Sequence, residues 1–159
     1  MINIQMVGQL QQCHWIDEGR NLLLTGATGT GKTYLSNALA MCALQRFKTV
    51  RYLRADHFIK LGEAARANGS ELEFENELSE LDLLIIDDFG LMDLDLGRAR
   101  LLLNIIECRD SRRSTIIASQ FPLQNWYGFI KDSSYADAFM DRLLTRAYKL
   151  ELSGPSLRN

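Results

Sequence analysis

The chain has 159 residues, of which 47% are hydrophobic and 24% charged, with a net charge of −2 at pH 7. This length and composition indicate a globular protein with one core and exclude a disordered chain or a coiled-coil rod. No apolar run approaches the roughly 18 residues that a membrane span needs, and no secretory signal begins the chain, so we expect a cytoplasmic protein with no membrane partner. Because the charge balance is acidic, any contact with DNA has to come from local basic patches.

The cysteines predict reduced thiols. Cys13, Cys42 and Cys108 are odd in number and scattered, which argues against a disulfide framework and favours thiols that are mostly buried. Cys13 stands beside His14, but no second pair lies at the spacing of a zinc site.

The first chemical motif in the chain is "GATGTGKT", at residues 26–33. It fits the pattern G-x-x-x-x-G-K-[ST] of a phosphate-binding loop, which needs a strand before it and a helix after it. Residues 21–25 form a short apolar run that is typical of a strand buried on both faces of a parallel sheet. After the loop, an apolar stripe recurs at helical spacing through Leu35, Ala38, Leu39, Cys42 and Ala43.

This strand, loop and helix predict a nucleotide site. Glycine-rich backbone at the start of a helix can turn its N–H groups around a phosphate. Lys32 would reach the β- and γ-phosphates of ATP or the β-phosphate of ADP, and the Thr33 hydroxyl would ligate Mg²⁺. The predicted nucleotide-binding residues are Gly26, Ala27, Thr28, Gly29, Thr30, Gly31, Lys32, Thr33 and Tyr34.

Strands and helices are expected to alternate along the rest of the chain. The predicted strands are 49–53, 83–86, 115–118 and 148–152, and the predicted helices are 55–68, 71–82, 96–106 and 136–147. The segment 71–82 carries six acidic residues and no basic one, and we interpret it as a helix with a solvated acidic face. Ser134 and Asp137 offer the last helix a start that resembles a capping box.

This order predicts an α/β fold of the P-loop NTPase type, with a doubly wound, parallel five-stranded sheet that has helices on both faces. No linker divides the chain, so we expect a single domain over residues 1–159. Ligands bind such sheets at the carboxyl ends of the strands. Gly26, Asp87, Asp88 and Ser119 all follow predicted strands and should therefore meet at one edge.

The two consecutive acids are given different roles. Asp87 is expected to hold Mg²⁺, directly or through a water molecule, as a Walker B carboxylate. Asp88 would orient and polarise the attacking water, or else cap the turn that follows it. Ser119 would donate a hydrogen bond to the γ-phosphate or the water, or else only end its strand.

Four stretches together resemble one known family, the AAA+ ATPases of the IstB and DnaC type. They are "WIDEGRNLLLTGATGTGKTYLSNAL", "LDLLIIDDFG", "STIIASQFPLQNW" and "DAFMDRLLTRAYKLELSGPSLR", which cover nearly everything from residue 15 to residue 158. The resemblance implies an ATPase domain without a carboxyl-terminal helical lid that forms homo-oligomers on DNA. Its implied partner is a transposase or a replicative helicase. Only 25 residues precede the loop, so we expect this chain to lack the amino-terminal region with which the family normally engages that partner.

The resemblance also implies a role for Arg142. Helical geometry places this residue on the surface, away from the apolar stripe of the last helix. In the family, the "DRL" position looks like the arginine finger that reaches into the nucleotide site of a neighbouring subunit. We therefore expect Arg142 to act in trans on the transferred phosphoryl group.

Other candidate contacts are weaker. The insertion by which the family is thought to touch DNA corresponds to residues 58–80, which contain only Lys60 and Arg66 as cations. Arg109, Arg112 and Arg113 form a basic cluster at the other edge of the sheet, which we interpret as a solvated loop rather than a DNA or partner contact. Trp15 lies where the family commonly contacts adenine, but a core position is favoured.

The sequence thus predicts a slow ATPase that serves as a DNA replication or transposition helper through nucleotide-dependent oligomerisation. Two alternatives stay open. One is a nucleotide-gated binding module without meaningful turnover, which Asp88 in place of the more usual Glu favours. The other is a small-molecule P-loop kinase, which would need an arginine-rich lid that this chain does not show.

Overall fold

The structure is a computed structural model that describes residues 4–153. Its elements, in chain order, are α1 (Ile4–Gln11), α2 (His14–Asp17), β1 (Asn21–Thr25), α3 (Lys32–Gln45), β2 (Val50–Arg54), α4 (Ala55–Ala67), α5 (Glu71–Glu80), β3 (Leu83–Asp87), α6 (Leu96–Arg109), β4 (Ser114–Ser119), the 3-10 helix η1 (Leu123–Phe129), α7 (Ser133–Leu144) and β5 (Ala147–Glu151).

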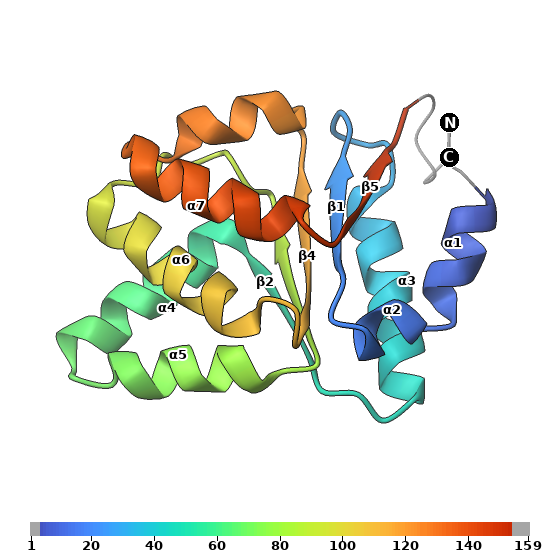
Figure 1. The fold of residues 1–159 in the computed structure, drawn as a ribbon, viewed down its shortest axis with the longest axis horizontal. Coiled ribbons are helices and arrows are strands. Elements are labelled where there is room, and N and C mark those ends of the chain that lie inside the picture. The colour runs from blue at the N-terminus through green and yellow to red at the C-terminus, as the bar shows by residue number, and fades with distance from the viewer. Residues whose placement is uncertain (1–3, 154–159) are drawn as a thin grey trace.

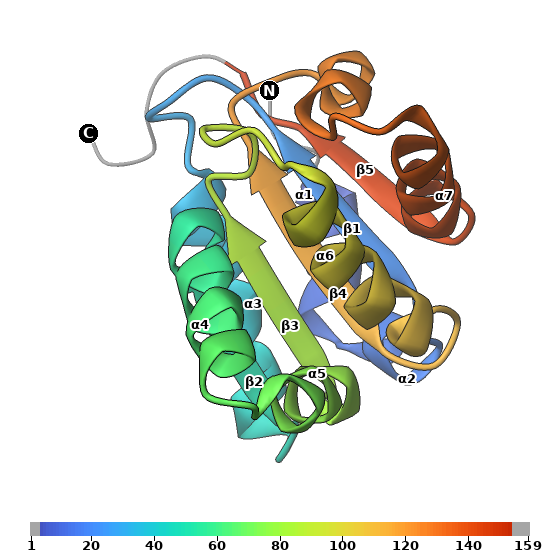
Figure 2. The same cartoon turned by 90° about the vertical axis from the view of Figure 1, so that its left-hand side faces the viewer.

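The five strands form one parallel sheet in the order β2-β3-β4-β1-β5, which confirms the predicted doubly wound architecture. Figures 1 and 2 show the strands running side by side in the same direction. Every residue of β3 and β4 is buried, because both strands lie in the interior of a sheet that helices cover on both sides. Their nearly continuous apolar runs are therefore the expected sequence signature.

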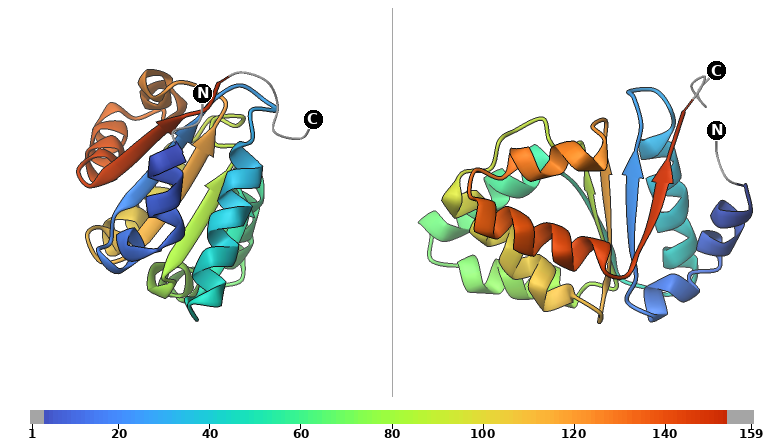
Figure 3. Two further views of the ribbon diagram at one scale, coloured as in Figure 1. Left: turned by 90° about the vertical axis from the view of Figure 1, so that its right-hand side faces the viewer. Right: turned by 45° about the horizontal axis from the view of Figure 1, so that its top comes forward.

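Helices cover the sheet in two groups. In Figure 1, α1, α2 and α3 lie on one side of the sheet, and α4, α5, α6 and α7 lie on the other. Figure 3 shows α3 lying along its face of the sheet, with α1 close to it. Each side has its own core, because alternate residues of a strand point to opposite faces. On β3, for example, Ile85 packs with the α3 side and Ile86 with the α6 side.

The parallel arrangement brings the carboxyl ends of the strands to one edge. Thr25, at the end of β1, is paired with Ser119, at the end of β4, and Asp87 ends the neighbouring strand β3. The loop at residues 26–31, which joins β1 to α3, begins at this same edge (Figure 1). The sheet therefore assembles the predicted site from segments that are far apart in the sequence.

Some local features differ from the sequence predictions. The helices α1, α2 and η1 were not predicted; each is short, and each has buried residues, Leu10 in α1, Trp15 and Ile16 in α2 and Trp126 in η1. The capping box at Ser134 and Asp137 was wrong. The N-cap of α7 is Asp132, whose carboxylate accepts a hydrogen bond from the Tyr135 amide at 3.0 Å.

The basic cluster also differs in part. Arg109 was expected in a solvated loop, but it is only 1% exposed. Its guanidinium donates to the carbonyls of Leu78, Leu81 and Ser114 and to the hydroxyl of Thr115. These four hydrogen bonds connect the end of α5, the end of α6 and the start of β4, so Arg109 is a structural residue.

The other two members of that cluster, Arg112 and Arg113, lie at the amino edge of the sheet, as expected. Both pair with Glu80.

All three cysteines are free thiols. Cys13 is buried, but Cys108 is exposed, which corrects the expectation of a buried thiol there. Within residues 4–153, no helix has both the length and the hydropathy of a membrane span.

Trp15 belongs to the core, as favoured. Its side chain is 3% exposed, and its indole N–H donates to the Leu10 carbonyl at 2.9 Å. Because it precedes β1, it lies at the amino edge of the sheet, away from the loop at residues 26–31.

Candidate functional site

A cavity of about 330 Å³ opens at the carboxyl edge of the sheet. It is bounded by the loop after β1, the start of α3 and the ends of β2, β3 and β4. Its lining residues are Thr28, Gly29, Gly31, Lys32, Thr33, Tyr52, Arg54, Asp87, Asp88 and Gln120. The structure thus brings together most of the residues that the sequence singled out.

The glycine-rich loop has the backbone that its sequence predicts. Gly26, Gly29 and Gly31 have φ angles of 150°, 87° and 103°, in a region that side chains disfavour. A side chain at Gly26 would also collide with the Leu152 carbonyl, at 2.4 Å from the added carbon. The Thr30 hydroxyl donates to the Ala27 carbonyl at 2.7 Å and closes the turn.

Lys32 lies inside this loop. Its side chain is buried, and its ammonium donates to the carbonyls of Gly26 at 2.5 Å and Ala27 at 3.1 Å. Burial lowers the pKa of Lys32, and the nearby carboxylates of Asp87 and Asp88 partly oppose that shift. The positive charge is therefore held at the centre of the loop, where a bound phosphate would lie.

The side chains of Asp87 and Thr33 are in contact with each other at the cavity. The Thr33 hydroxyl donates to Asp87 Oδ2 at 2.7 Å, and the Asp88 amide donates to Asp87 Oδ1 at 2.8 Å. Tyr52, on the neighbouring strand, also donates its phenol hydroxyl to Asp87 Oδ2. Asp87 is only 1% exposed, so these donors compensate for burying its charge.

The same pair of side chains fits a magnesium ion. Mg²⁺ prefers oxygen ligands and is commonly held by one or two protein groups together with substrate phosphates. The hydroxyl of Thr33 and the carboxylate of Asp87 supply such oxygens beside the phosphate loop. Among the described residues, no group of three or more His, Cys, Asp or Glu side chains is arranged to hold a metal, so a cation at this edge would depend on phosphate ligands as well.

Asp88 lines the cavity but differs from Asp87 in its surroundings. Its φ of 57° places it in the left-handed region, which turns the chain sharply after β3. Its carboxylate is partly exposed and pairs with Arg54, with 3.4 Å between Nη1 and Oδ2. The two adjacent carboxylates thus have different environments: that of Asp87 is buried among hydrogen-bond donors, and that of Asp88 is partly exposed at the cavity.

Ser119 lies at the carboxyl edge of the sheet, as predicted, but its side chain does not face the cavity. It is fully buried; its hydroxyl donates to the Phe89 carbonyl at 2.6 Å and accepts from the Phe121 amide at 3.1 Å. The next residue, Gln120, lines the cavity instead, and its Oε1 accepts a hydrogen bond from the Thr28 hydroxyl at 2.8 Å. The polar side chain that this strand end presents to the cavity is therefore that of Gln120.

Arg142 lies far from this cavity in the fold. It is on the last turn of α7, which leads into the amino end of β5. Its side chain is 38% exposed and pairs with the carboxylates of Glu107, Asp110 and Asp141. The predicted surface position is thus confirmed, and the residue is at the opposite edge of the sheet from its own phosphate loop.

Sequence reasoning missed three residues that line the cavity. Arg54 ends β2 and Gln120 follows β4, so the rule that ligands gather at carboxyl ends would have found both. Tyr52 has a subtler signal. It is paired with Ile85, two residues before Asp87 on the same face of β3, and its long side chain reaches the carboxylate.

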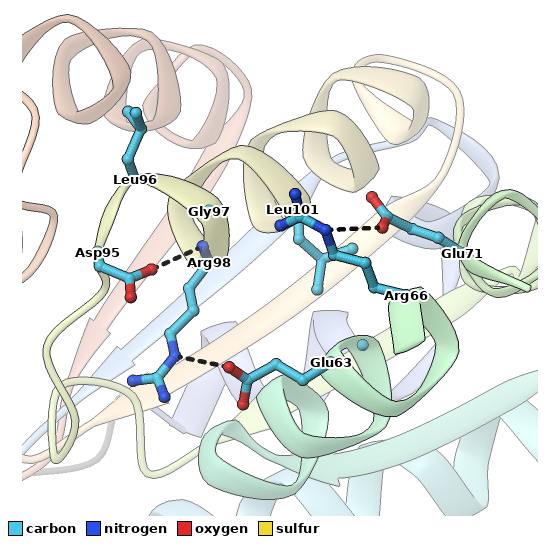
Figure 4. A pocket seen from close by; sticks show the side chains of 9 residues that line it. Glu63, Arg66, Glu71, Asp95, Leu96, Gly97, Arg98 and Leu101 are labelled. Atoms are coloured by element: carbon cyan, nitrogen blue, oxygen red, sulfur yellow. Dashed lines mark hydrogen bonds and ion pairs between the residues drawn. The ribbon is translucent and has the colours of Figure 1, made fainter. Parts of the chain in front are cut away.

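A second cavity, of about 370 Å³, lies between α4, α5 and the start of α6 (Figure 4). Its charged side chains pair with one another, Arg98 with Glu63 and Arg66 with Glu71. At its edge, Asp95 caps α6 by accepting from the Arg98 amide at 3.0 Å. This cavity shares no lining residue with the one at the phosphate loop.

Known structures share this fold. The chain superposes on the crystal structure of the DnaC helicase loader with a TM-score of 0.76 and 19% identity, covering 94% of this chain and 88% of the other. For DnaI the TM-score is 0.78 with 22% identity, covering 96% and 81%. For DnaA from Aquifex aeolicus, bound to AMPPCP, it is 0.73 with 22% identity, covering 94% and 45%. The fold is therefore that of the P-loop AAA+ proteins.

Curated relatives come from mobile elements. The insertion sequence ATP-binding protein y4uH of Sinorhizobium fredii is 41% identical over 144 residues, which are 91% of this chain and 58% of the relative. The insertion sequence IS21 ATP-binding protein of Pseudomonas aeruginosa is 28% identical over 158 residues, covering 99% and 59%. The chain spans somewhat more than half the length of these relatives.

The family comparison agrees with these relatives and with the resemblance drawn from the sequence. The family model described as IstB-like ATP binding protein matches residues 2–159, which is nearly the full chain and includes every residue of the cavity. The chain therefore belongs to the IstB-like ATP-binding protein family.

Proposed function

We propose that this chain binds Mg·ATP at the carboxyl edge of its sheet and hydrolyses it slowly, as a nucleotide-dependent helper in transposition or DNA replication. The observation that carries the proposal is the meeting of Lys32, Thr33, Asp87 and Asp88 around one cavity. These residues come from two separate segments of the chain and combine a phosphate cradle, oxygen ligands and a second, partly exposed carboxylate.

The binding roles follow from the geometry. The loop amides and the Lys32 ammonium would bind the phosphates, because a charge-assisted contact replaces the carbonyls that Lys32 now contacts. Thr33 and Asp87 would hold Mg²⁺, which neutralises charge on the β- and γ-phosphates when it is bound. The exposed Tyr34 stands next in α3, beyond the phosphate cradle.

The hydrolytic roles fall to Asp88 and Gln120. Asp88 presents a carboxylate to the cavity and would orient the attacking water. Gln120 takes the role that the sequence assigned to Ser119, since its side chain faces the cavity and already touches the phosphate loop through Thr28. Its amide can donate to the γ-phosphate or to the water.

Arg142 would complete the site of a neighbouring subunit. It is at the opposite edge of the sheet from the phosphate loop of its own chain, so it cannot serve its own nucleotide. Its pairing with Glu107, Asp110 and Asp141 holds the guanidinium at the surface. A homo-oligomer that packs this edge against the phosphate loop of the next subunit would place a positive charge on the transferred phosphoryl group.

The proposed partners are DNA together with a transposase or a replicative helicase. The relatives named as insertion sequence proteins support the transposase, and the likeness to the DnaC helicase loader supports only the shared fold. The segment 58–80 offers little positive charge for DNA binding, because it carries only two cations, of which Lys60 is exposed and Arg66 is paired with Glu71.

The test is ATP turnover measured with and without DNA, at several protein concentrations. An oligomeric ATPase requires no acceptor and gains specific activity as the concentration rises. A kinase would turn over only with an acceptor. The absence of turnover at all concentrations, with binding intact, would replace the ATPase by a nucleotide-gated binding module, which the pairing of Asp88 with Arg54 favours as the second candidate.

A further inference from the structure

Asp87 has almost no free hydrogen-bonding capacity. A carboxylate offers about four acceptor positions, two on each oxygen. Asp87 Oδ2 accepts from the hydroxyls of Thr33 and Tyr52, and Oδ1 accepts from the Asp88 amide. One position, on Oδ1, stays available to a cation or to a water bound to it.

The direction of the hydrogen bond from Thr33 to Asp87 determines whether the Thr33 oxygen can bind a cation. A hydroxyl that ligates a cation does so through a lone pair, so its proton has to point elsewhere. The Thr33 proton points to Asp87 Oδ2, which leaves the oxygen lone pairs available to the cavity. This arrangement lasts only while the carboxylate keeps its present orientation.

A cation in the same cavity attracts that carboxylate. Lys32 lines the cavity, and it is close enough for Asp87 to raise the pKa of the lysine against the effect of burial. A rotation of the Asp87 side chain towards Lys32 would break its hydrogen bond with Thr33. The phenol of Tyr52 opposes that rotation, because it is fixed on β2 and donates to the same oxygen as Thr33.

We propose that Tyr52 is a positioning residue for the cation site, which acts by fixing the Asp87 carboxylate so that Thr33 turns its lone pairs towards Mg²⁺. The inference rests on the proposed function, because it concerns the Mg²⁺ that accompanies the nucleotide. It assigns no contact between Tyr52 and the phosphates. Removing the phenol hydroxyl should therefore weaken the Mg²⁺ dependence of binding and leave metal-free nucleotide binding unchanged.

The experiment uses Tyr52→Phe, which removes one hydroxyl and keeps the ring. Binding of the non-hydrolysable analogue AMPPCP is measured by calorimetry in EDTA and at increasing Mg²⁺ concentration. We expect the Mg²⁺ concentration for half of the full enhancement to rise by about tenfold, the magnitude of one hydrogen bond to a charged group. The affinity in EDTA should equal that of the wild type.

Two further variants separate this role from a general one. Tyr127→Phe removes a hydroxyl from a partly exposed tyrosine of η1, outside the cavity, and should change neither measurement. In an Asp87→Asn background, Tyr52→Phe should cause no additional shift in the Mg²⁺ requirement, because Tyr52 acts through Asp87. A full additional shift in that background would overturn the proposal.

The remaining outcomes are also decisive. An unchanged Mg²⁺ requirement in Tyr52→Phe, or an equal loss of affinity in EDTA and in Mg²⁺, would show that Tyr52 does not position the cation site. Failure of the wild type to bind AMPPCP under any condition would instead overturn the proposed function. Thermal unfolding of each variant, measured alongside, identifies any loss that comes from the fold.

Discussion

The consecutive residues Asp87 and Asp88 show how position within one turn separates two identical side chains. Asp87 ends a buried strand and is surrounded by three donors. Asp88 has left-handed backbone, which turns its carboxylate towards the cavity and Arg54. The first is therefore suited to a fixed role in holding a cation, and the second to a role that needs an accessible carboxylate.

Asp88→Asn should keep Mg·ATP affinity and lose most of its turnover. Asn tolerates the left-handed backbone about as well as Asp, so the turn is preserved, while the neutral amide cannot polarise water as a carboxylate does. Phosphate release and calorimetric binding, measured on the same preparation, check both statements. Asp93→Asn, at an exposed carboxylate that pairs with Lys131, is the matched control. Normal hydrolysis by Asp88→Asn would reduce Asp88 to a turn residue.

Gln120→Ala and Ser119→Ala should differ in what they lose. Gln120 is exposed and lines the cavity, so its truncation should lower kcat with little effect on stability. Ser119 is buried, and its truncation leaves the Phe89 carbonyl without its donor, which costs about 1–3 kcal/mol of unfolding free energy. Urea unfolding and steady-state turnover separate the two effects. If Ser119→Ala lowered kcat in a fully folded protein and Gln120→Ala did not, the original assignment to Ser119 would stand.

Among the elements, the helices on the α6 side of the sheet depend on one buried guanidinium. Arg109 satisfies carbonyls at the end of α5 and at the start of β4 while belonging to the last turn of α6. Backbone carbonyls at such ends have no partner within their own helix, so a side chain has to supply one. Burial lowers the pKa of Arg109, and its hydrogen bonds to carbonyl oxygens compensate for the burial.

Arg109→Lys should therefore destabilise the protein even though the charge is kept. A lysine ammonium has three donors on one atom and cannot reach three carbonyls and a hydroxyl in the fork geometry of arginine. We expect a loss of about 2–4 kcal/mol in the free energy of unfolding, as for other broken buried polar networks. Arg112→Lys, at the exposed neighbour, should change it by less than about 0.5 kcal/mol. Equal effects of the two variants in urea unfolding would show that Arg109 does not hold these elements together.

The strands and the long helices could be predicted because their signals are local. Apolar runs such as residues 83–86 and helical stripes such as that of α3 are visible in a single window of sequence, and their order determines the sheet. The residues of the phosphate loop, Asp87 and Asp88 could be found in the same way. What each side chain contacts depends on distant segments, so neither the burial of Arg109 nor the inward turn of Ser119 could be predicted from its neighbours in sequence.

At the scale of the whole molecule, the separation of Arg142 from the phosphate loop is the informative feature. The two lie at opposite edges of one parallel sheet. If Arg142 acts on ATP, as proposed, it has to act on the ATP of another subunit, and activity would then be a property of the oligomer. Within the single chain, the surface carboxylates Glu107, Asp110 and Asp141 pair with the guanidinium.

Arg142→Ala should bind ATP nearly as well as the wild type but lose turnover. Mixing it with Lys32→Ala subunits should restore part of the activity, because some interfaces then combine an intact phosphate loop with an intact arginine. Phosphate release across a series of mixing ratios, with light scattering to confirm co-assembly, measures this. Arg98→Ala, at a surface arginine that pairs with Glu63, controls for loss of charge. An activity that never rises above the sum of the two variants, despite co-assembly, would exclude action in trans.

Every role proposed above depends on nucleotide binding at the loop, and Lys32 tests it. Because its ammonium is buried within the loop, where the phosphates would lie, Lys32→Ala should weaken Mg·ATP binding by at least about tenfold, measured by calorimetry. Lys48→Ala, whose side chain pairs with Asp17, should bind as the wild type does. Circular dichroism establishes that each variant is folded. A folded Lys32→Ala variant that binds Mg·ATP as tightly as the wild type would show that this cavity is not the nucleotide site.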